Sequence, residues 1–167
     1  KRSMKKIILL MNKFGAEFFP KNKYFFPLRI SSSNFPIGIS YKSGNSAQLK
    51  SAVILAGLNS YGNTEIIESF KSRDHTENML LKNKKVINIK NKNKKKKLIK
   101  IYGKKNLDPV NITVPGDPSS AAFFAALTIL NDKSSIKIKN IGLNPTRIGF
   151  YLLLKKYKAK IKFENLK

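Results

Sequence analysis

The sequence predicts an α/β (α+β) fold, because apolar segments with the periodicity of helices and of strands alternate along its 167 residues. Hydrophobic residues make up 41% of the chain, which is enough for a core in one domain or in parts of two. The pattern also repeats with a shift of roughly 72 residues, which places "SAQLKSAVILAGLN" over "PSSAAFFAALTILN". Such repetition predicts a pseudo-symmetric assembly in which each copy buries what its neighbour exposes.

Each repeat is expected to hold a helix that starts with small residues, a strand, a second helix and another strand. A partial copy stands at the front, where "IILLMNKFGAEFF" resembles "YLLLKKYKAKIKF". The predicted helices are Met4–Phe14, Ala47–Asn59, Asp74–Lys82, Ser119–Leu130 and Thr146–Tyr157. The predicted strands are Phe25–Ile30, Ile37–Ser40, Thr64–Glu68, Val86–Lys90, Leu98–Tyr102, Val110–Val114, Ile136–Lys139 and Lys160–Phe163.

The formal charge of +25, from 34 Lys+Arg against 9 Asp+Glu, would make nucleic acid or an anionic membrane the first partner to consider. The excess is almost all Lys, with Arg rare, whereas a face selected for phosphate or base contacts would more often hold Arg. The stretch "NKNKKKKLIK" has no interleaved aromatics to stack bases, so we expect a solvated hairpin or loop there. We therefore expect neither a specific nucleic acid nor a membrane as partner.

The sequence lacks the signals for several other kinds of binding site and for a targeting segment. There is no cysteine, no spacing typical of metal ligands and no glycine pattern for phosphate or dinucleotide binding. No segment approaches the ~20 apolar residues of a membrane span, and "KRSMKKIILLMNKFG" predicts an amphipathic helix and no signal peptide. We expect a cytoplasmic protein, and a piece of a longer chain, since the sequence opens without a start methionine.

The helix from Ala47 begins with small neutral residues, Ser46, Ala47 and Gln48, and carries Lys50 one step further on. Helix N-termini expose N–H groups and a partial positive charge, so a small-residue start allows an anion to come close. Ser46 could add a hydroxyl and Gln48 an amide donor to such a site. In the simpler alternative Ser46 only caps the helix and Gln48 lies on its surface.

The segment "SRDHTENML" follows a buried strand and holds one of the few arginines, Arg73. Its guanidinium could point to the same end of the layer as Ser46. Asp74 or Ser72 can cap the following helix, with Glu77 placed as in a capping box. His75 is the only histidine, and we expect it to be structural because no catalytic partner for it is evident.

The segment "VPGDPSSAAFF" repeats the small-residue helix start after a rigid turn. The turn is either a boundary between two domains or an ordinary strand-to-helix turn capped by Asp117 or Ser119. "NPTRIGF" repeats this pattern once more, with Arg147 as its arginine.

Together these motifs resemble those of the enolpyruvylshikimate phosphate synthase family. "KRSM", "NSAQLKSAVILAGL", "SRDHTENML", "VPGDPSSAAFFAA" and "GLNPTRIGF" occur there in this order and at similar spacing. The resemblance covers nearly the whole chain and is weakest from Asn83 to Asn111. "SAQLKSAVILAGL" and "SRDHTE" are similar to the bacterial type that is often insensitive to glyphosate.

The resemblance implies the enolpyruvyl transferase fold, in which two domains each hold three βαβαββ units about a pseudo-threefold axis, as an inside-out α/β barrel. Only a part of that fold is expected in this chain. Residues 1–113 would form part of the first-half domain, about two repeat units, residues 114–118 would cross between the domains, and residues 119–167 would start the second.

The resemblance further implies transfer of the enolpyruvyl (carboxyvinyl) group of phosphoenolpyruvate to the 5-hydroxyl of shikimate 3-phosphate, a step of chorismate and aromatic amino acid biosynthesis. No cofactor is implied. Carried over by motif, Ser46, Ala47, Gln48 and Arg73 would contact shikimate 3-phosphate, and Gln48 would also reach phosphoenolpyruvate.

The family's early Lys-Ser-x-x-x-Arg motif, its phosphoenolpyruvate-binding glycine and arginine, its catalytic Asp and its Lys-Glu pair are expected outside this stretch. We therefore expect no catalytic residue here, no turnover by this chain alone, and a monomer when full length. The related transferase that acts on UDP-N-acetylglucosamine is one alternative. A basic nucleic-acid-binding module, supported by charge alone, is an alternative of another class.

Overall fold

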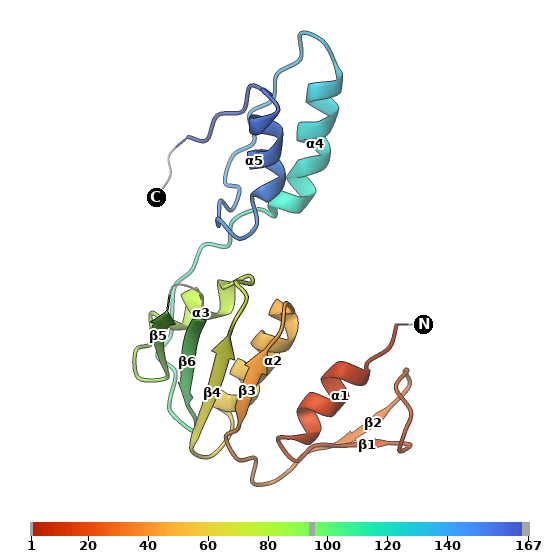
Figure 1. Ribbon diagram of the computed structural model, residues 1–167, viewed down its shortest axis with the longest axis vertical. Helices are drawn as coiled ribbons and strands as arrows, with labels where there is room; N and C mark the ends of the chain where they lie inside the picture. Colours follow the sequence, from red (N-terminus) through yellow and green to blue (C-terminus); the bar gives the residue numbers. More distant parts are fainter. Residues whose placement is uncertain (1, 94–95, 165–167) are drawn as a thin grey trace. The chain divides into compact units, whose positions relative to one another are not determined.

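The computed structural model describes residues 2–93 and 96–164, which form two compact units (Figure 1). The first unit runs from Lys1 to Val110 and the second from Asn111 to Lys167. The division falls near the crossing predicted at residues 114–118.

The first unit opens with a helix followed by an antiparallel strand pair. These elements are α1 (Lys5–Asn12), β1 (Glu17–Phe19) and β2 (Arg29–Ser31). Gly15, between α1 and β1, has φ +86°, a left-handed conformation that favours glycine, and a Cβ there would lie 2.9 Å from Cβ of Ser33. The close turn at Gly15 therefore brings β1 back along α1.

The rest of the first unit is one complete βαβαββ unit, as the resemblance implied. Its elements are β3 (Ser40–Ser43), α2 (Ala47–Leu58), β4 (Asn63–Glu68), α3 (His75–Leu80), β5 (Ile87–Asn93) and β6 (Lys96–Tyr102). The sheet order is β3-β4-β6-β5, with β3 and β4 parallel and the other pairs antiparallel. Helix α2 makes the crossover that a parallel pair requires. The order α1-β1-β2 matches the last three elements of this unit.

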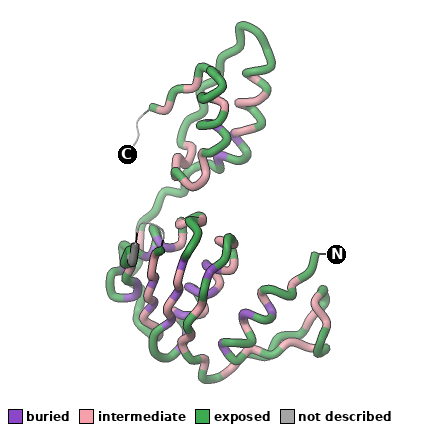
Figure 2. Tube along the Cα trace, in the orientation of Figure 1, coloured by how far each residue is buried: buried purple, intermediate pink, exposed green. Residues whose placement is uncertain are grey.

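The core lies between α2 and the sheet. Along β4, Thr64, Ile66 and Glu68 are buried, because alternate residues of a strand face the same side. Figure 2 shows buried segments along α2 and the sheet, and further ones on α1 and in the second unit. The core cluster consists of Leu10, Phe14, Val53, Ile54, Ile66, Leu80, Val86, Ile87, Ile99 and Ile101.

The second unit contains α4 (Pro118–Leu130) and α5 (Gly149–Lys156). These helices stand where the shift of roughly 72 residues places α2 and α3. The hydroxyl of Tyr151 on α5 donates a 2.6 Å hydrogen bond to the carbonyl oxygen of Pro118 on α4. Gly116 and Ile141 form an isolated parallel bridge.

The predicted helices are all present, but several predicted strands are wrong. Within the described residues, Val110–Val114, Ile136–Lys139 and Lys160–Phe163 form no strand, because a strand needs a partner and no strand of the second unit pairs with them. The predicted strands Phe25–Ile30 and Ile37–Ser40 are displaced to Arg29–Ser31 and Ser40–Ser43. Pro27, which has no N–H to donate, lies inside the first of these segments, and Ile37 in the second forms an isolated parallel bridge with Tyr61.

Candidate functional site

A hollow of about 650 Å³ lies at the start of α2. Arg2 and the first turn of α1 line one side, and Ser46, Gln48 and Leu49 line the other. Nη2 of Arg2 donates a 3.4 Å hydrogen bond to Oε1 of Gln48. We call this hollow the α2 groove. It joins the motif "KRSM" to "NSAQLK", which are far apart in the sequence.

Ser46 is the N-cap of α2. Its backbone is extended, with φ −92° and ψ 103°, and its Oγ accepts a 3.3 Å hydrogen bond from the N–H of Leu49. Gln48 is exposed and Ala47 is half-buried. This geometry therefore agrees with the simpler alternative, in which Ser46 caps the helix and Gln48 lies on its surface. The Ser46 hydroxyl still has its proton to donate, so a role in binding an anion stays a prediction.

Arg73 lies in the turn between β4 and α3, and its side chain is exposed. It does not line the α2 groove, nor does Ala47. The structure thus places Ser46 and Gln48 together, whereas Arg73 is connected to them through the buried cluster described next. His75 is the exposed first residue of α3.

Lys50 is fully buried on the face of α2 that also carries Val53, Ile54 and Gly57. Its Nζ lies 2.7 Å from Oε1 of Glu68 and 2.6 Å from Oε1 of Glu77. Buried charges are stable only when they are paired, and here one ammonium meets two carboxylates. We call Lys50, Glu68, Glu77 and Ser72 the Lys50 cluster.

Glu68 is the most strongly bound member of the Lys50 cluster. Besides Lys50, its Oε1 accepts hydrogen bonds from the N–H of Ser72 at 3.2 Å and from Oγ of Ser72 at 2.9 Å. Burial raises the pKa of Glu68, but the hydrogen bonds from Lys50 and Ser72 and the charge of Lys50 outweigh it, so the pKa lies below its ordinary value.

The predicted capping box at α3 is wrong. Asp74 is the N-cap but makes no side-chain cap hydrogen bond, and Glu77 is fully buried against Lys50. The Lys50 contact of Glu77 lies outside hydrogen-bonding geometry, and neither Glu77 oxygen accepts a hydrogen bond from the residues that the structure describes. A buried ammonium attracts a second carboxylate more strongly than an exposed helix end does. A 2.8 Å hydrogen bond between the hydroxyls of Ser51 and Thr76 also joins α2 to α3.

The Lys50 cluster was not predicted, although the sequence contained the signals for it. Lys50 is spaced from Val53, Ile54 and Gly57 by the three, four and seven residues that define one helix face. Glu68 alternates with Ile66 on one face of a strand. A cation and an anion at core-facing positions of adjacent elements indicate a buried ion pair.

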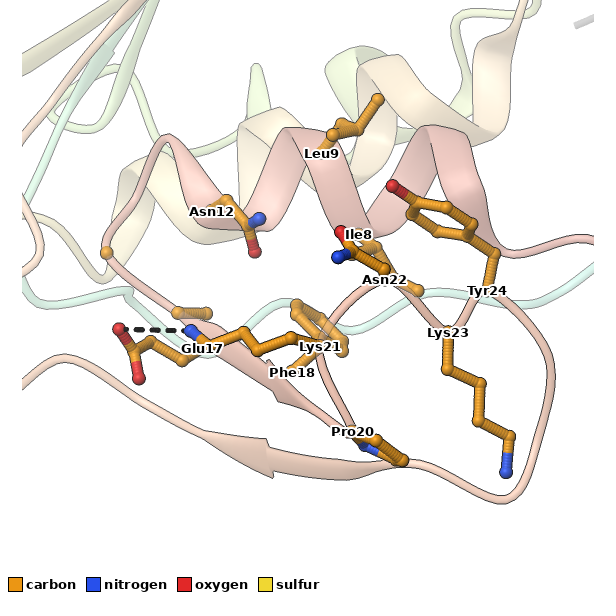
Figure 3. A pocket seen from close by; sticks show the side chains of 12 residues that line it. Ile8, Leu9, Asn12, Glu17, Phe18, Pro20, Lys21, Asn22, Lys23 and Tyr24 are labelled. Carbon is orange, nitrogen blue, oxygen red and sulfur yellow. Dashed lines mark ion pairs between the residues drawn. The ribbon is translucent and has the colours of Figure 1, made fainter.

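A second hollow, of about 350 Å³, lies between α1 and the segment from Glu17 to Tyr24 (Figure 3). Figure 3 shows Glu17 paired with Lys21, whose Nζ lies 3.5 Å from Oε1 of Glu17. Lys23 points away from the hollow in the same view. Because its charged groups pair with each other or face away, this hollow is a weaker candidate than the α2 groove.

In the second unit, Asp117 is the N-cap of α4 and accepts a hydrogen bond from the N–H of Ser119 at 3.0 Å. Arg147 donates to Oδ1 of Asp117 at 2.5 Å and to Oγ of Ser119 at 2.7 Å. The Ser119 N–H, followed by the charge of Arg147, holds the pKa of Asp117 below its ordinary value. Arg147 thus supports the helix start, which agrees with the expectation of a cap at Asp117.

The described parts of the chain offer neither a metal site nor a membrane-spanning helix. No group of three or more His, Cys, Asp or Glu side chains there could hold a metal ion. None of the helices described is both long and apolar enough to span a bilayer.

The fold and the α2 groove define a mixed α/β protein that contains a complete βαβαββ unit and has a groove at a helix start. The family model of EPSP synthase (3-phosphoshikimate 1-carboxyvinyltransferase) matches residues 1–167. This chain therefore belongs to the EPSP synthase family.

Individual relatives agree with this assignment. The 3-phosphoshikimate 1-carboxyvinyltransferase of Aquifex aeolicus is 45% identical over 83% of this chain and 32% of its own length. That of Zymomonas mobilis is 38% identical over 99% of this chain and 36% of its own length. An EPSP synthase structure from Acinetobacter baumannii covers the whole chain with a TM-score of 0.77 at 34% identity, over 37% of its own length. The chain thus spans about a third of the length of the relatives it matches.

Proposed function

We propose that this chain supplies part of the substrate site of an enzyme that joins phosphoenolpyruvate to shikimate 3-phosphate. In that reaction the 5-hydroxyl oxygen of shikimate 3-phosphate forms a bond to the enolpyruvyl carbon that carried phosphate, and inorganic phosphate leaves. The observation that supports this proposal best is the α2 groove, where Arg2, Ser46 and Gln48 line one hollow at a helix N-terminus. Family membership supplies the identity of the substrates.

Shikimate 3-phosphate would bind at the start of α2. Its phosphate would accept hydrogen bonds from the Ser46 hydroxyl, the Gln48 amide and the free N–H groups of the first turn. The small side chain of Ala47 leaves room for this approach. Arg73, exposed in the turn after β4, would supply the counter-charge.

Phosphoenolpyruvate would lie toward Arg2. Its carboxylate and phosphate need cationic donors, and the Arg2 guanidinium already contacts Oε1 of Gln48. This proposal revises our expectation that the arginine for phosphoenolpyruvate lies outside the chain. Gln48 would then face both substrates, as the resemblance implied.

The remaining groups of the enzyme would come from parts of the relatives that this chain does not span. We propose that residues 1–113 belong to the first domain, residues 114–118 to the crossing and residues 119–167 to the second domain of a monomer. The chain would lack the catalytic acid and base. The motifs "SAQLKSAVILAGL" and "SRDHTE" further support the glyphosate-insensitive bacterial type, for which retained activity of the full-length enzyme in glyphosate is the test.

The test is a titration of the chain with shikimate 3-phosphate at physiological salt, followed by amide NMR. We expect selective shifts at Ser46, Gln48 and Arg73. Inorganic phosphate and a short single-stranded DNA serve as controls, because nonspecific polyanion binding weakens steeply with salt. A folded chain without selective shifts would contradict the proposal, and a stronger response to DNA would favour a basic nucleic-acid-binding module.

A further inference from the structure

We propose that Glu68 is a positioning residue, which, through Lys50 and Ser72, holds the start of α2 and the Arg73 turn in one fixed arrangement. The proposal rests on the proposed function, since the groups so arranged are those assigned to shikimate 3-phosphate. The proposed reaction assigns no contact with substrate to Lys50, Glu68, Glu77 or Ser72. These four residues nevertheless contain the most deeply buried charges of the described chain.

One connection runs from Glu68 to the α2 groove. Glu68 Oε1 binds Nζ of Lys50 at 2.7 Å, and the backbone N–H of Lys50 donates a 3.1 Å hydrogen bond to the carbonyl oxygen of Ser46. Lys50 therefore lies one helical turn after the cap. Its side chain is fully buried, so it fixes that first turn against the end of β4.

The other connection runs from Glu68 to the turn that carries Arg73. The same Oε1 of Glu68 accepts hydrogen bonds from both the N–H and the Oγ of Ser72, the residue directly before Arg73. A carboxylate oxygen that accepts three donors is held in one orientation. One atom of β4 thus determines where both candidate binding segments lie.

Glu77 has a different part in the cluster. It contacts Nζ of Lys50 at 2.6 Å but binds neither Ser72 nor any other donor that the structure describes. Glu77 balances charge and joins α3 to α2, a connection that the Ser51–Thr76 hydrogen bond also makes. Loss of Glu68 would release the Arg73 turn, whereas loss of Glu77 would leave the connection from Lys50 through Glu68 to Ser72 intact.

This difference gives a matched test with Glu68→Met and Glu77→Met. Both changes remove a carboxylate at a site no more than 4% exposed, and both leave Lys50 with one carboxylate partner. The affinity of the chain for shikimate 3-phosphate and the amide shifts of residues 46–48 and 72–74 are measured for each variant. Glu65→Gln, which removes the charge of a partly exposed β4 residue paired with Lys100, is the control.

We expect Glu68→Met to weaken binding by about tenfold or more, the scale on which residues that orient metal ligands act in metal sites. It should also shift the amides of Ser72 and Arg73 in the free chain. Glu77→Met and Glu65→Gln should change the affinity by less than about threefold. Glu68→Gln should restore much of the affinity, since its amide oxygen can still accept from Ser72 and Lys50.

The inference would be overturned if Glu68→Met and Glu77→Met weakened the affinity equally. It would also be overturned if a folded Glu68→Met chain bound with unchanged affinity, because a purely structural role affects stability alone. If Glu68→Met does not fold, Ser72→Ala tests the same connection. An unchanged amide chemical shift of Arg73 and an unchanged affinity for shikimate 3-phosphate in that variant would count against the inference. A wild-type chain that does not bind shikimate 3-phosphate would refute the proposed function and this role with it. Binding that survives in every variant would refute the positioning role alone.

Discussion

The hydroxyl of Tyr151 donates a 2.6 Å hydrogen bond to the carbonyl oxygen of Pro118 and so joins α5 to the first residue of α4. Tyr151 is also the most buried residue of α5, at 8% exposed. This hydrogen bond therefore joins the two helices of a unit in which the predicted strands do not form.

Replacement of Tyr151 by Phe should weaken the second unit. The change leaves the ring in place but removes one buried hydrogen bond, so we expect a loss of about 1 kcal/mol in the free energy of opening α4 and α5. Amide hydrogen exchange in the two helices measures this loss. Tyr157→Phe is the control, because Tyr157 is 77% exposed; equal exchange in both variants would contradict the prediction.

Gly57 should not tolerate alanine, although alanine usually stabilises a helix interior. A Cβ at Gly57 would lie 2.9 Å from Cβ of Thr64, where α2 crosses β4. Overpacking typically costs about 1–3 kcal/mol, more than the roughly 1 kcal/mol gained from helix propensity. We therefore expect Gly57→Ala to lower the free energy of unfolding of the first unit, measured in urea by the fluorescence of its tyrosines.

Gly149→Ala is the control for this change. Gly149 is also helical, but a Cβ there meets no atom within 4 Å, so alanine should be neutral or stabilising. A Gly57→Ala chain as stable as the wild type would mean that α2 can move away from β4 at little cost.

The βαβαββ unit was well predicted because both of its signals are local. A continuous apolar run after a cap residue marks α2, and alternation marks β4 and β6, where burial follows the sequence pattern. The segment Ile136–Lys139 has the same apolar alternation, yet it forms no strand because pairing depends on a neighbour and not on the segment itself.

The candidate site was predicted only in part, for a related reason. Motif resemblance identified Ser46 and Gln48 but not Arg2, which reaches the same groove from the segment before α1. Glu77 was interpreted from its spacing to Asp74, as a capping residue, whereas its position is determined by Lys50 on another element. Contacts between distant segments decide such cases, and spacing along the chain does not contain them.

Acid should destabilise the start of α4. The pKa of Asp117 is lowered in the folded chain, so its contribution to stability is present above the ordinary value of 3.8 and is lost as the pH falls through the folded value. Titration of the Asp117 carboxyl carbon by NMR, alongside the α4 amides, checks this. Asp117→Asn should remove the acid-dependent change at Ser119, and a midpoint at or above 3.8 would contradict the prediction.

The chain alone should not catalyse the reaction. Phosphoenolpyruvate and shikimate 3-phosphate would meet at most part of a site, without an acid or base to move protons. Phosphate release in the presence of both substrates is the measurement, with heat-unfolded chain as the background control. Release above this background, at substoichiometric protein, would show that the chain contains its own catalytic groups.

Ser46 allows the helix cap to be separated from the substrate contact. Ser46→Ala removes both roles, so we expect about 1 kcal/mol lower stability and weaker binding of shikimate 3-phosphate.

Ser46→Asp keeps a good cap acceptor for the Leu49 N–H but places a negative charge where the phosphate should bind. It should therefore retain the stability of the wild type while losing affinity by about tenfold or more, since like charges in close contact repel strongly. Urea unfolding and an NMR titration of the same samples give the two quantities. Ser119→Asp, which adds a negative charge in the first turn of α4, is the control for added charge. Undiminished affinity in Ser46→Asp would mean that the phosphate does not lie at the start of α2, and that Ser46 serves the helix alone.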